Sequence, residues 1–164
     1  MKTKTKFLGE VDTGKEQVLT FPAGLAGMAH RQRFILLRRE EIRPFYWLQS
    51  VEDGDFLLPV VEPTPFFPDY RVVVSEGEVQ NLGMTDTADG LVLCIVTLES
   101  DPMSITANLQ GPLVVNRKNG LGRQVILIDN AFTAREDLLE AGKSGICHQD
   151  RLPEGEILQI KKRR

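Results

Sequence analysis

Short apolar and β-branched runs alternate along this chain with turns that are rich in glycine, proline and asparagine. The longest apolar run, Leu91–Leu98, contains four β-branched residues and is too short for a typical helix, so we expect a buried central strand. There are about nine or ten such runs, which predicts a mainly β protein with one or two short helices. We expect a compact, antiparallel single domain, either a partly closed β-barrel-like sheet or a sandwich.

Two hairpins are predicted in the first half of the chain. Lys6–Val11 and Gln17–Phe21 are β-prone and are joined by Asp12–Lys15, which has the composition of a tight turn. Phe45–Ser50 alternates between two faces, and Phe56–Val61 returns beside it. The single tryptophan lies in the first strand of this second pair, and we expect it to fill the core. Further strands are expected at Arg33–Arg38, Arg71–Val74 and Ile105–Leu109.

Capping signals predict two short helices. Ser75–Leu82 begins with an N-cap serine, Glu78 follows at the capping-box position, and Gly83 provides a stop. Thr133–Leu139 begins with a threonine that is followed three residues later by a glutamate, and Gly142 would end this second helix.

A third hairpin is expected in the second half of the chain. Pro112–Asn116 and Gln124–Ile128 are apolar runs that flank a polar loop, Arg117–Gly122. This loop contains Asn119–Gly120, a dipeptide that favours a turn because both residues tolerate positive φ. Asn108–Pro112 interrupts the strand pattern just before the hairpin.

Two other segments do not fit regular strands. Phe21–Gly27 contains one proline and two glycines, so we expect a shaped loop there. Glu62–Tyr70 carries three prolines around Phe66 and Phe67, and proline cannot donate to a sheet ladder. The second segment is therefore expected at the surface or at a sheet edge. Its two rings either tuck back onto the sheet or form an apolar patch that contacts a partner.

The charge of the chain is unevenly distributed. The formal net charge is −3, and the last four residues contribute +4, so Met1–Ile160 carries −3 − 4 = −7. An acidic body repels phosphate backbones, which disfavours direct nucleic-acid binding and favours a basic protein partner. An acidic surface that serves only solubility explains the same numbers. No apolar run approaches the roughly 20 residues of a membrane helix, and no secretory signal is recognisable, so we expect a cytoplasmic protein.

Candidate catalytic and metal-binding groups are few. The only histidines, His30 and His148, lack partners at the spacing of zinc ligands, so we expect no metal site and no cofactor. Cys94 lies in an apolar run and Cys147 in a polar tail, and we expect both to be free thiols. Gly120–Gln124 leads into a strand, whereas phosphate-binding loops open a helix. The sequence therefore favours a binding protein over an enzyme.

Several motifs occur together in a characteristic order. Thr106–Asn116 (TANLQGPLVVN) is followed by Gly120–Leu127 (GLGRQVIL), and three shorter stretches precede this pair, at Phe21–Gly27, Pro44–Ser50 and Pro65–Tyr70. In order and spacing these stretches resemble the FliW family of flagellar assembly factors. The resemblance covers about residues 7–139, and it implies a compact β-barrel-like fold.

The resemblance also implies a function and two partners. FliW-type factors bind CsrA, a small basic repressor of flagellin translation, and they bind flagellin itself. Free FliW binds CsrA away from its RNA site and lifts repression, whereas accumulated flagellin occupies FliW and restores repression. A switch of this kind makes and breaks no covalent bond, and a monomer is the simplest form that exchanges two partners.

We expect a few buried apolar anchors to supply most of the partner affinity. The candidate partner-binding residues are Phe66, Phe67, Asp69, Met103, Ile105 and Asn108. A strand edge near Ile105 is a candidate site for β-augmentation by a partner segment. Structural roles are the alternatives: Ile105 fills the core, and the Asn108 side chain stabilises a turn.

Two other functions stay open from sequence alone. One is a small-molecule-binding β-barrel or an enzyme built on it, which needs a polar constellation inside the sheet. The other is RNA binding through the basic residues Lys161–Arg164 and a β-face. We expect residues 1–142 to form the FliW-like domain and residues 143–164 to form a C-terminal extension or tail, in which Gly155–Ile160 can add an edge strand.

Overall fold

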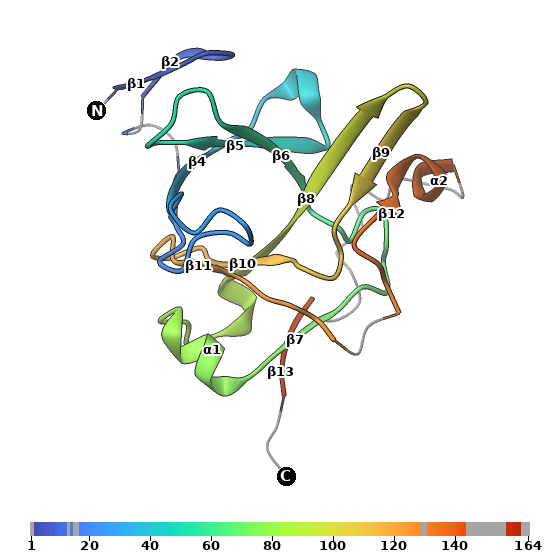
Figure 1. The fold of residues 1–164 in the computed structure, drawn as a ribbon. Coiled ribbons are helices and arrows are strands. Elements are labelled where there is room, and N and C mark those ends of the chain that lie inside the picture. The colour runs from blue at the N-terminus through green and yellow to red at the C-terminus, as the bar shows by residue number, and fades with distance from the viewer. Residues whose placement is uncertain (1, 13, 15–16, 129–130, 144–156, 162–164) are drawn as a thin grey trace.

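The structure is a computed structural model that describes residues 2–12, 14, 17–128, 131–143 and 157–161. Within these residues, one antiparallel sheet of nine strands forms most of the fold (Figure 1). Its main path runs in the order β11 (Gly122–Gln124), β10 (Leu113–Asn116), β8 (Gly90–Ser100), β6 (Leu57–Val61), β5 (Phe45–Ser50), β4 (Arg33–Leu37) and β3 (Gln17–Thr20). From β8 the strand β9 (Met103–Ala107) branches off, and β9 pairs on its other edge with β12 (Glu136–Asp137).

Smaller elements surround this sheet. The strands β1 (Lys2–Thr5) and β2 (Gly9–Asp12) form an antiparallel hairpin, and β7 (Val72–Val74) pairs in parallel with β13 (Leu158–Ile160). The helices are α1 (Glu76–Asn81) and α2 (Leu138–Lys143), and the 3-10 turns are η1 (Glu40–Ile42) and η2 (Thr87–Asp89). In the described part of the chain, neither helix has the length and apolar character needed to cross a membrane.

The two edges of the main path approach each other. Thr20 of β3 forms a parallel bridge with Leu121, and the Thr20 N–H donates to the carbonyl oxygen of Gly120 at 2.8 Å. Among the described residues no longer ladder crosses this seam, so the sheet is barrel-like without being closed. The expected mainly β, antiparallel, single-domain fold is confirmed.

The core lies on both sides of the central strand β8. Val92, Cys94 and Val96 face one cluster, which also contains the buried residues of β7 and α1. Leu91 and Leu93 face the other cluster, inside the curled sheet. Residues 90–96 of β8 are thus buried or half-buried between the two clusters, as the apolar run predicts, whereas residues 97–100 are exposed, so the expectation of a buried strand is wrong at Thr97 and Leu98.

Helix α1 follows the capping signals closely. The Ser75 hydroxyl oxygen accepts from the Glu78 N–H at 3.2 Å, and the Glu78 carboxylate accepts from the Ser75 N–H at 2.9 Å. Gly83 follows the C-cap with φ +65°, a conformation that glycine adopts without strain. The predicted capping box and stop are therefore confirmed.

The predicted N-terminal hairpin is wrong in its pairing. Strand β2 pairs with β1, not with β3, and β3 pairs with β4. The β1–β2 turn is closed locally, because the Thr5 hydroxyl donates to the Gly9 carbonyl oxygen at 2.7 Å and accepts from the Leu8 N–H at 3.0 Å. Pairing with β4 buries Leu19 completely, and burial across the main sheet decides the partner of β3.

The third hairpin is shorter than its apolar pattern suggests. Strand β11 covers Gly122–Gln124, whereas the prediction placed this strand at Gln124–Ile128 and Gly122 in the loop, so the predicted bounds are wrong. Beyond Gln124, the N–H groups of Val125 and Leu127 donate to the carbonyl oxygens of Pro112 and Gln110. The chain therefore runs alongside the irregular stretch that precedes β10 and leaves the regular ladder.

The second helix begins later than expected. Glu136 and Asp137 form β12, and α2 starts at Leu138, where Asp137 Oδ1 accepts from the N–H groups of Leu139 and Glu140 at 2.9 and 3.1 Å. Glu136 does accept from the Thr133 N–H at 2.7 Å, but this contact closes a turn and caps no helix. Gly142, expected as the stop, lies inside α2.

Trp47 is only half-buried, so the expectation that it fills the core is met only in part. Its ring packs against a small third cluster of Val11, Ile35 and Leu37, between the main sheet and β2.

The expected strand near the end of the chain is present as β13, which covers residues 158–160.

Candidate protein-binding surface

The proline-rich segment before β7 is a turn that holds both of its phenylalanines against the core. The N–H groups of Phe66 and Phe67 donate to the Pro63 carbonyl oxygen at 3.0 and 2.8 Å. Both rings are half-buried on the cluster that contains β7 and α1. The Phe67 ring meets that of Phe132 edge-on, with centroids 5.7 Å apart. The rings thus tuck back onto the sheet, and Asp69 at the end of the turn is exposed.

The β8–β9 hairpin carries apolar side chains into solvent. Leu98 pairs with Ile105 and Ser100 pairs with Met103, so all four side chains point to the same face. Leu98 is 56% exposed and Met103 is 70% exposed, whereas Ile105 is half-buried against the core. The hairpin extends beyond the body of the molecule (Figure 1). The strip formed by Leu98, Met103 and Ile105, called the hairpin strip below, is therefore accessible to a large partner.

Asn108 has a clear structural role. Its side-chain oxygen accepts from the N–H groups of Gln110 and Gly111 at 3.1 and 2.9 Å, which fixes the turn between β9 and β10. Its backbone N–H donates to the Ile95 carbonyl oxygen at 2.9 Å. The expected turn-stabilising role of the Asn108 side chain is therefore present in the structure.

An open groove of about 600 Å³ lies between β7 and the chain that follows β11. Ile126 and Ile128 project from one wall and are 66% and 89% exposed, and Val73 projects from the other. The groove also contains Phe132, whose ring contacts Phe67. Its charged lining residues are Asp69, Arg71 and Lys161. The groove and the Phe66–Phe67 turn are therefore parts of one continuous surface.

Ile126, Ile128 and Val73 were missed by the sequence analysis. Residues 125–128 are all apolar, so their pattern does not show which side chains face solvent. The one sequence signal is Pro112, which interrupts the strand that would pair with residues 125–128. Without a regular partner strand, this segment does not have to bury both of its faces.

A second groove, of about 350 Å³, is strongly charged. Arg38 lies over the Tyr46 ring at 5.4 Å, and Arg43 pairs with Glu40 at 3.3 Å. Burial and the Glu62 carboxylate raise the pKa of Tyr46.

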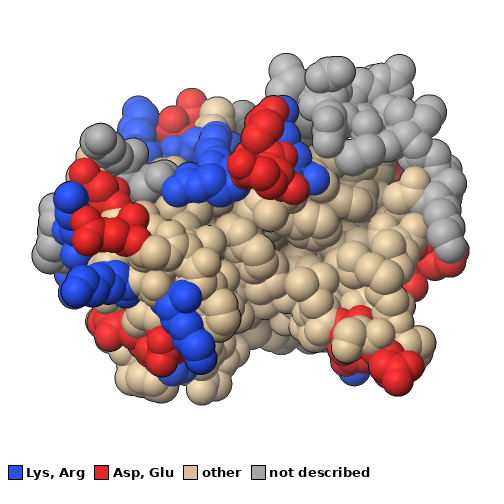
Figure 2. Space-filling model, turned by 90° about the horizontal axis from the view of Figure 1, so that it is seen from above, with Lys and Arg blue, Asp and Glu red and all other residues tan. Residues whose placement is uncertain are grey.

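Seen from above, charged side chains gather toward one side of the molecule and a broad uncharged area extends beside them (Figure 2).

The described residues hold no group of three or more potential metal ligands. Burial raises the pKa of the Cys94 thiol to about 12, so this cysteine stays protonated and is a poor nucleophile. Burial also raises the pKa of Tyr70, whose hydroxyl lies beside that thiol. Cys147 and His148 lie outside the described residues.

The described surface exposes several large apolar side chains, and the comparisons with known proteins agree in one family. Residues 2–138 match the model of the FliW protein family. The chain belongs to the FliW family. A FliW relative from Natranaerobius thermophilus is 34% identical over 139 residues, which are 84% of this chain and 92% of the relative. One from Clostridium beijerinckii is 37% identical over 139 residues, 85% of this chain and 99% of the relative. Both relatives are named flagellar assembly factor FliW.

A solved structure supports the same assignment. The crystal structure of the flagellar assembly factor FliW superimposes with a TM-score of 0.76 at 30% identity, covering 84% of this chain and 96% of that one. The FliW resemblance seen in the sequence motifs is therefore confirmed, and so is the fold that it implies.

Proposed function

We propose that this chain is a flagellar assembly factor that acts by binding proteins, with flagellin and the repressor CsrA as alternative partners. Membership of the FliW family carries this proposal, because the match extends over nearly the whole length of relatives that are named flagellar assembly factors. The exposed apolar side chains beside the Phe66–Phe67 turn and on the β8–β9 hairpin support it.

In this proposal the chain is a switch without an enzymatic step. When flagellin leaves the cell, the freed protein binds CsrA away from its RNA-binding site and lifts repression of flagellin translation. When flagellin accumulates, it occupies the protein and repression returns. The acidic body steers the basic CsrA towards it, and apolar anchors then hold the complex.

The anchors proposed from sequence keep their place in this scheme, with roles that the geometry refines. Asp69 lines the groove, and Phe67 contacts its lining residue Phe132, with Phe66 beside it in the same turn. Met103 and Ile105 lie on the β8–β9 hairpin, and Asn108 shapes the turn between β9 and β10. Ile126 and Ile128 join them as exposed groove residues.

The protein works in the cytoplasm as a monomer in this proposal, with no direct contact to nucleic acid or membrane. Residues 1–142 form the domain that binds partners, and residues 143–164 form an extension.

Binding to purified partners tests the proposal. We expect the unchanged chain to bind both flagellin and CsrA, and each partner to displace the other in calorimetric or anisotropy titrations. Ile128→Glu and Met103→Glu place a charge on surfaces that are already exposed, so both variants should fold normally. At least one of them should weaken binding of a partner about tenfold or more.

Phe7→Glu is the matched control, because Phe7 is 60% exposed but lies in the remote β1–β2 turn. Loss of binding in Phe7→Glu alone would place the partner surface elsewhere. If the unchanged chain binds neither flagellin nor CsrA, the proposed function is wrong.

A further inference from the structure

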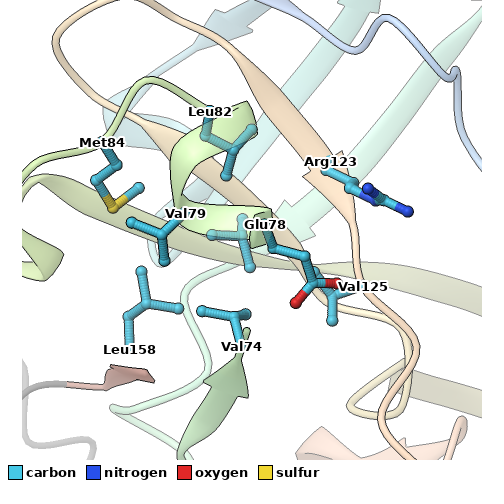
Figure 3. Close-up of a pocket in the computed structure, with 9 residues that line it drawn as sticks. Val74, Glu78, Val79, Leu82, Met84, Arg123, Val125 and Leu158 are labelled. Atoms are coloured by element: carbon cyan, nitrogen blue, oxygen red, sulfur yellow. The ribbon is translucent and has the colours of Figure 1, made fainter. Parts of the chain in front are cut away.

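A single leucine of β13 fills an apolar socket beneath α1. The Leu158 side chain is 1% exposed and lies among Val74, Val79, Leu82 and Met84. In Figure 3, Leu158 and Val74 lie below Val79, Leu82 and Met84, and the Glu78 side chain lies to one side of them. Val114, Val125 and Arg123 complete the lining.

The socket is shaped closely around this leucine. A Cβ added at Gly90 would lie 2.6 Å from Leu158 Cδ2 and 3.1 Å from the Thr87 carbonyl oxygen. The backbone of Gly90 has φ −77° and ψ 131°, which any residue adopts without strain. A Cβ at position 90 would therefore occupy space that the end of the Leu158 side chain now fills, so one of the two has to shift.

Strand β13 is held by few contacts. Its three residues pair only with β7 in the described structure, through bonds such as Val72 N–H to the Ile157 oxygen and Lys161 N–H to the Val74 oxygen. Leu158 is its one buried residue, and Gln159 and Ile160 are exposed. A strand with so little buried surface opens more readily than the strands of the main sheet.

Leu158 and the residues around it differ in whether they lie inside the range that matches the FliW family model. Every wall residue lies within residues 2–138, the range that matches the FliW family model. Leu158 lies outside that range. In this chain, therefore, a residue from outside the family-matched range packs among side chains from inside it.

We propose that this socket, with the β7 edge beside it, is a docking site for an extended segment of a partner protein, and that β13 occupies it in the free chain. The chemistry of the partner segment is read from β13 itself. It is an extended strand that pairs in parallel with β7 and presents a leucine-sized apolar side chain, a polar residue and a second apolar residue in succession. Binding of the partner requires β13 to leave.

Amide hydrogen exchange of the unchanged chain is the first test. The N–H groups of Val72 and Lys161 bridge β7 and β13, so their exchange reports release of β13. We expect them to exchange at least about tenfold faster than the amides of β8, without global unfolding. Equal rates would mean that β13 leaves only when the whole domain unfolds, and the proposal would be overturned.

A peptide in trans is the second test. The probe is a fluorescently labelled peptide with the sequence of residues 155–161, and the receptor is the full-length chain carrying Leu158→Asp, which empties the socket. We expect this variant to bind the peptide roughly tenfold or more tightly than the unchanged chain, because β13 no longer competes in cis. Equal binding by the two chains would contradict the proposal.

Two matched variants show where the peptide binds. Adding Gly90→Ala to Leu158→Asp should abolish binding by occluding the socket, whereas adding Gly142→Ala, whose Cβ meets nothing within 4 Å, should not change it. A labelled peptide with aspartate in place of the leucine should not bind. Peptide binding that survives Gly90→Ala would place the contact elsewhere and overturn the proposal.

A second copy of the chain is the competing occupant. If the unchanged chain dimerises with rising concentration and Leu158→Asp abolishes the dimer, β13 is exchanged between copies and the proposal for a different partner is wrong. The peptide measurements use neither flagellin nor CsrA, so they succeed or fail separately from the proposed function.

Discussion

The phenolic hydroxyl of Tyr70 donates a hydrogen bond of 2.7 Å to the backbone carbonyl oxygen of Leu109. Both residues are fully buried. Tyr70 ends the turn that holds Phe66 and Phe67, and Leu109 follows Asn108 in the turn between β9 and β10. One bond thus fixes the two turns that carry the proposed anchors relative to each other.

Tyr70→Phe removes this bond while keeping the ring. We expect the free energy of unfolding to fall by about 1 kcal/mol, the usual net contribution of a buried hydrogen bond. Urea denaturation measures the change. Tyr46→Phe is the control, since Tyr46 is half-buried and lies over a solvent-filled groove, and its effect should be smaller. Equal losses in the two variants would contradict the assigned role of the Tyr70 hydroxyl.

Stability should decline in alkaline solution because of Cys94. The pKa of its thiol is about 12 in the folded protein, against an ordinary value of 9.0. Above pH 9 the unfolded chain loses this proton and the folded chain keeps it, so folding stability that is complete below pH 9 is lost as the pH rises towards 12. The loss approaches about 1.4 kcal/mol per pH unit for one group.

The alkaline effect is checked with Cys94→Ala. Unfolding free energies measured between about pH 9 and 10, before tyrosines contribute strongly, should depend less on pH in this variant than in the parent. Identical slopes for Cys94→Ala and the parent would show that another group titrates.

The capping box of α1 gives a third prediction. Ser75→Ala removes the side chain that accepts from the Glu78 N–H, so we expect a loss of about 1 kcal/mol in unfolding free energy. Glu76→Ala lies on the same exposed turn without a capping role and should change stability by less than about half that amount. If both variants melt at the same temperature, the cap does not stabilise the folded state.

Gly122 gives a prediction about packing. A Cβ at this position would lie 2.5 Å from the ring of Phe21, which is fully buried against Phe34. Gly122→Ala should therefore cost about 1–3 kcal/mol, the usual range for overpacking a core. Gly142→Ala is the control in open space, and thermal melting compares the two. A neutral Gly122→Ala would mean that the Phe21 ring moves aside freely.

Local signals predicted the elements whose stability is local. The strand at Leu91–Val96 could be placed because a strand buried on both faces needs no outside information, whereas the exposure of Leu98 at the end of the same apolar run could not be predicted. The capping box at Ser75 could be placed because both of its hydrogen bonds lie within four residues. Pairing could not be predicted in the same way: Gln17–Thr20 is equally suitable for β2 and for β4, and burial of Leu19 in the assembled sheet decides between them.

The candidate surface was predictable in position but not in exposure. The sequence located Phe66 and Phe67 on an irregular segment, yet the aromatic partner that draws Phe67 inward, Phe132, is far away in the chain. Ile126 and Ile128 sit in an unbroken apolar run, so the sequence gives no reason to expect them outside. Exposure depends on where the neighbouring strand stops, and that is settled only by tertiary structure.

The seam between Thr20 and Gly120 has a consequence for biosynthesis. The two residues are about 100 positions apart, and Gly120 has φ +75° with no room for a Cβ beside the Val18 oxygen. During translation β3 and β4 emerge early, but the residue that meets Thr20 emerges only after most of the chain has been made. Formation of the contact between Thr20 and Gly120 is therefore a late folding event that closes a loop of about 100 residues. Until then, the edge of β3 in the nascent protein lacks this contact.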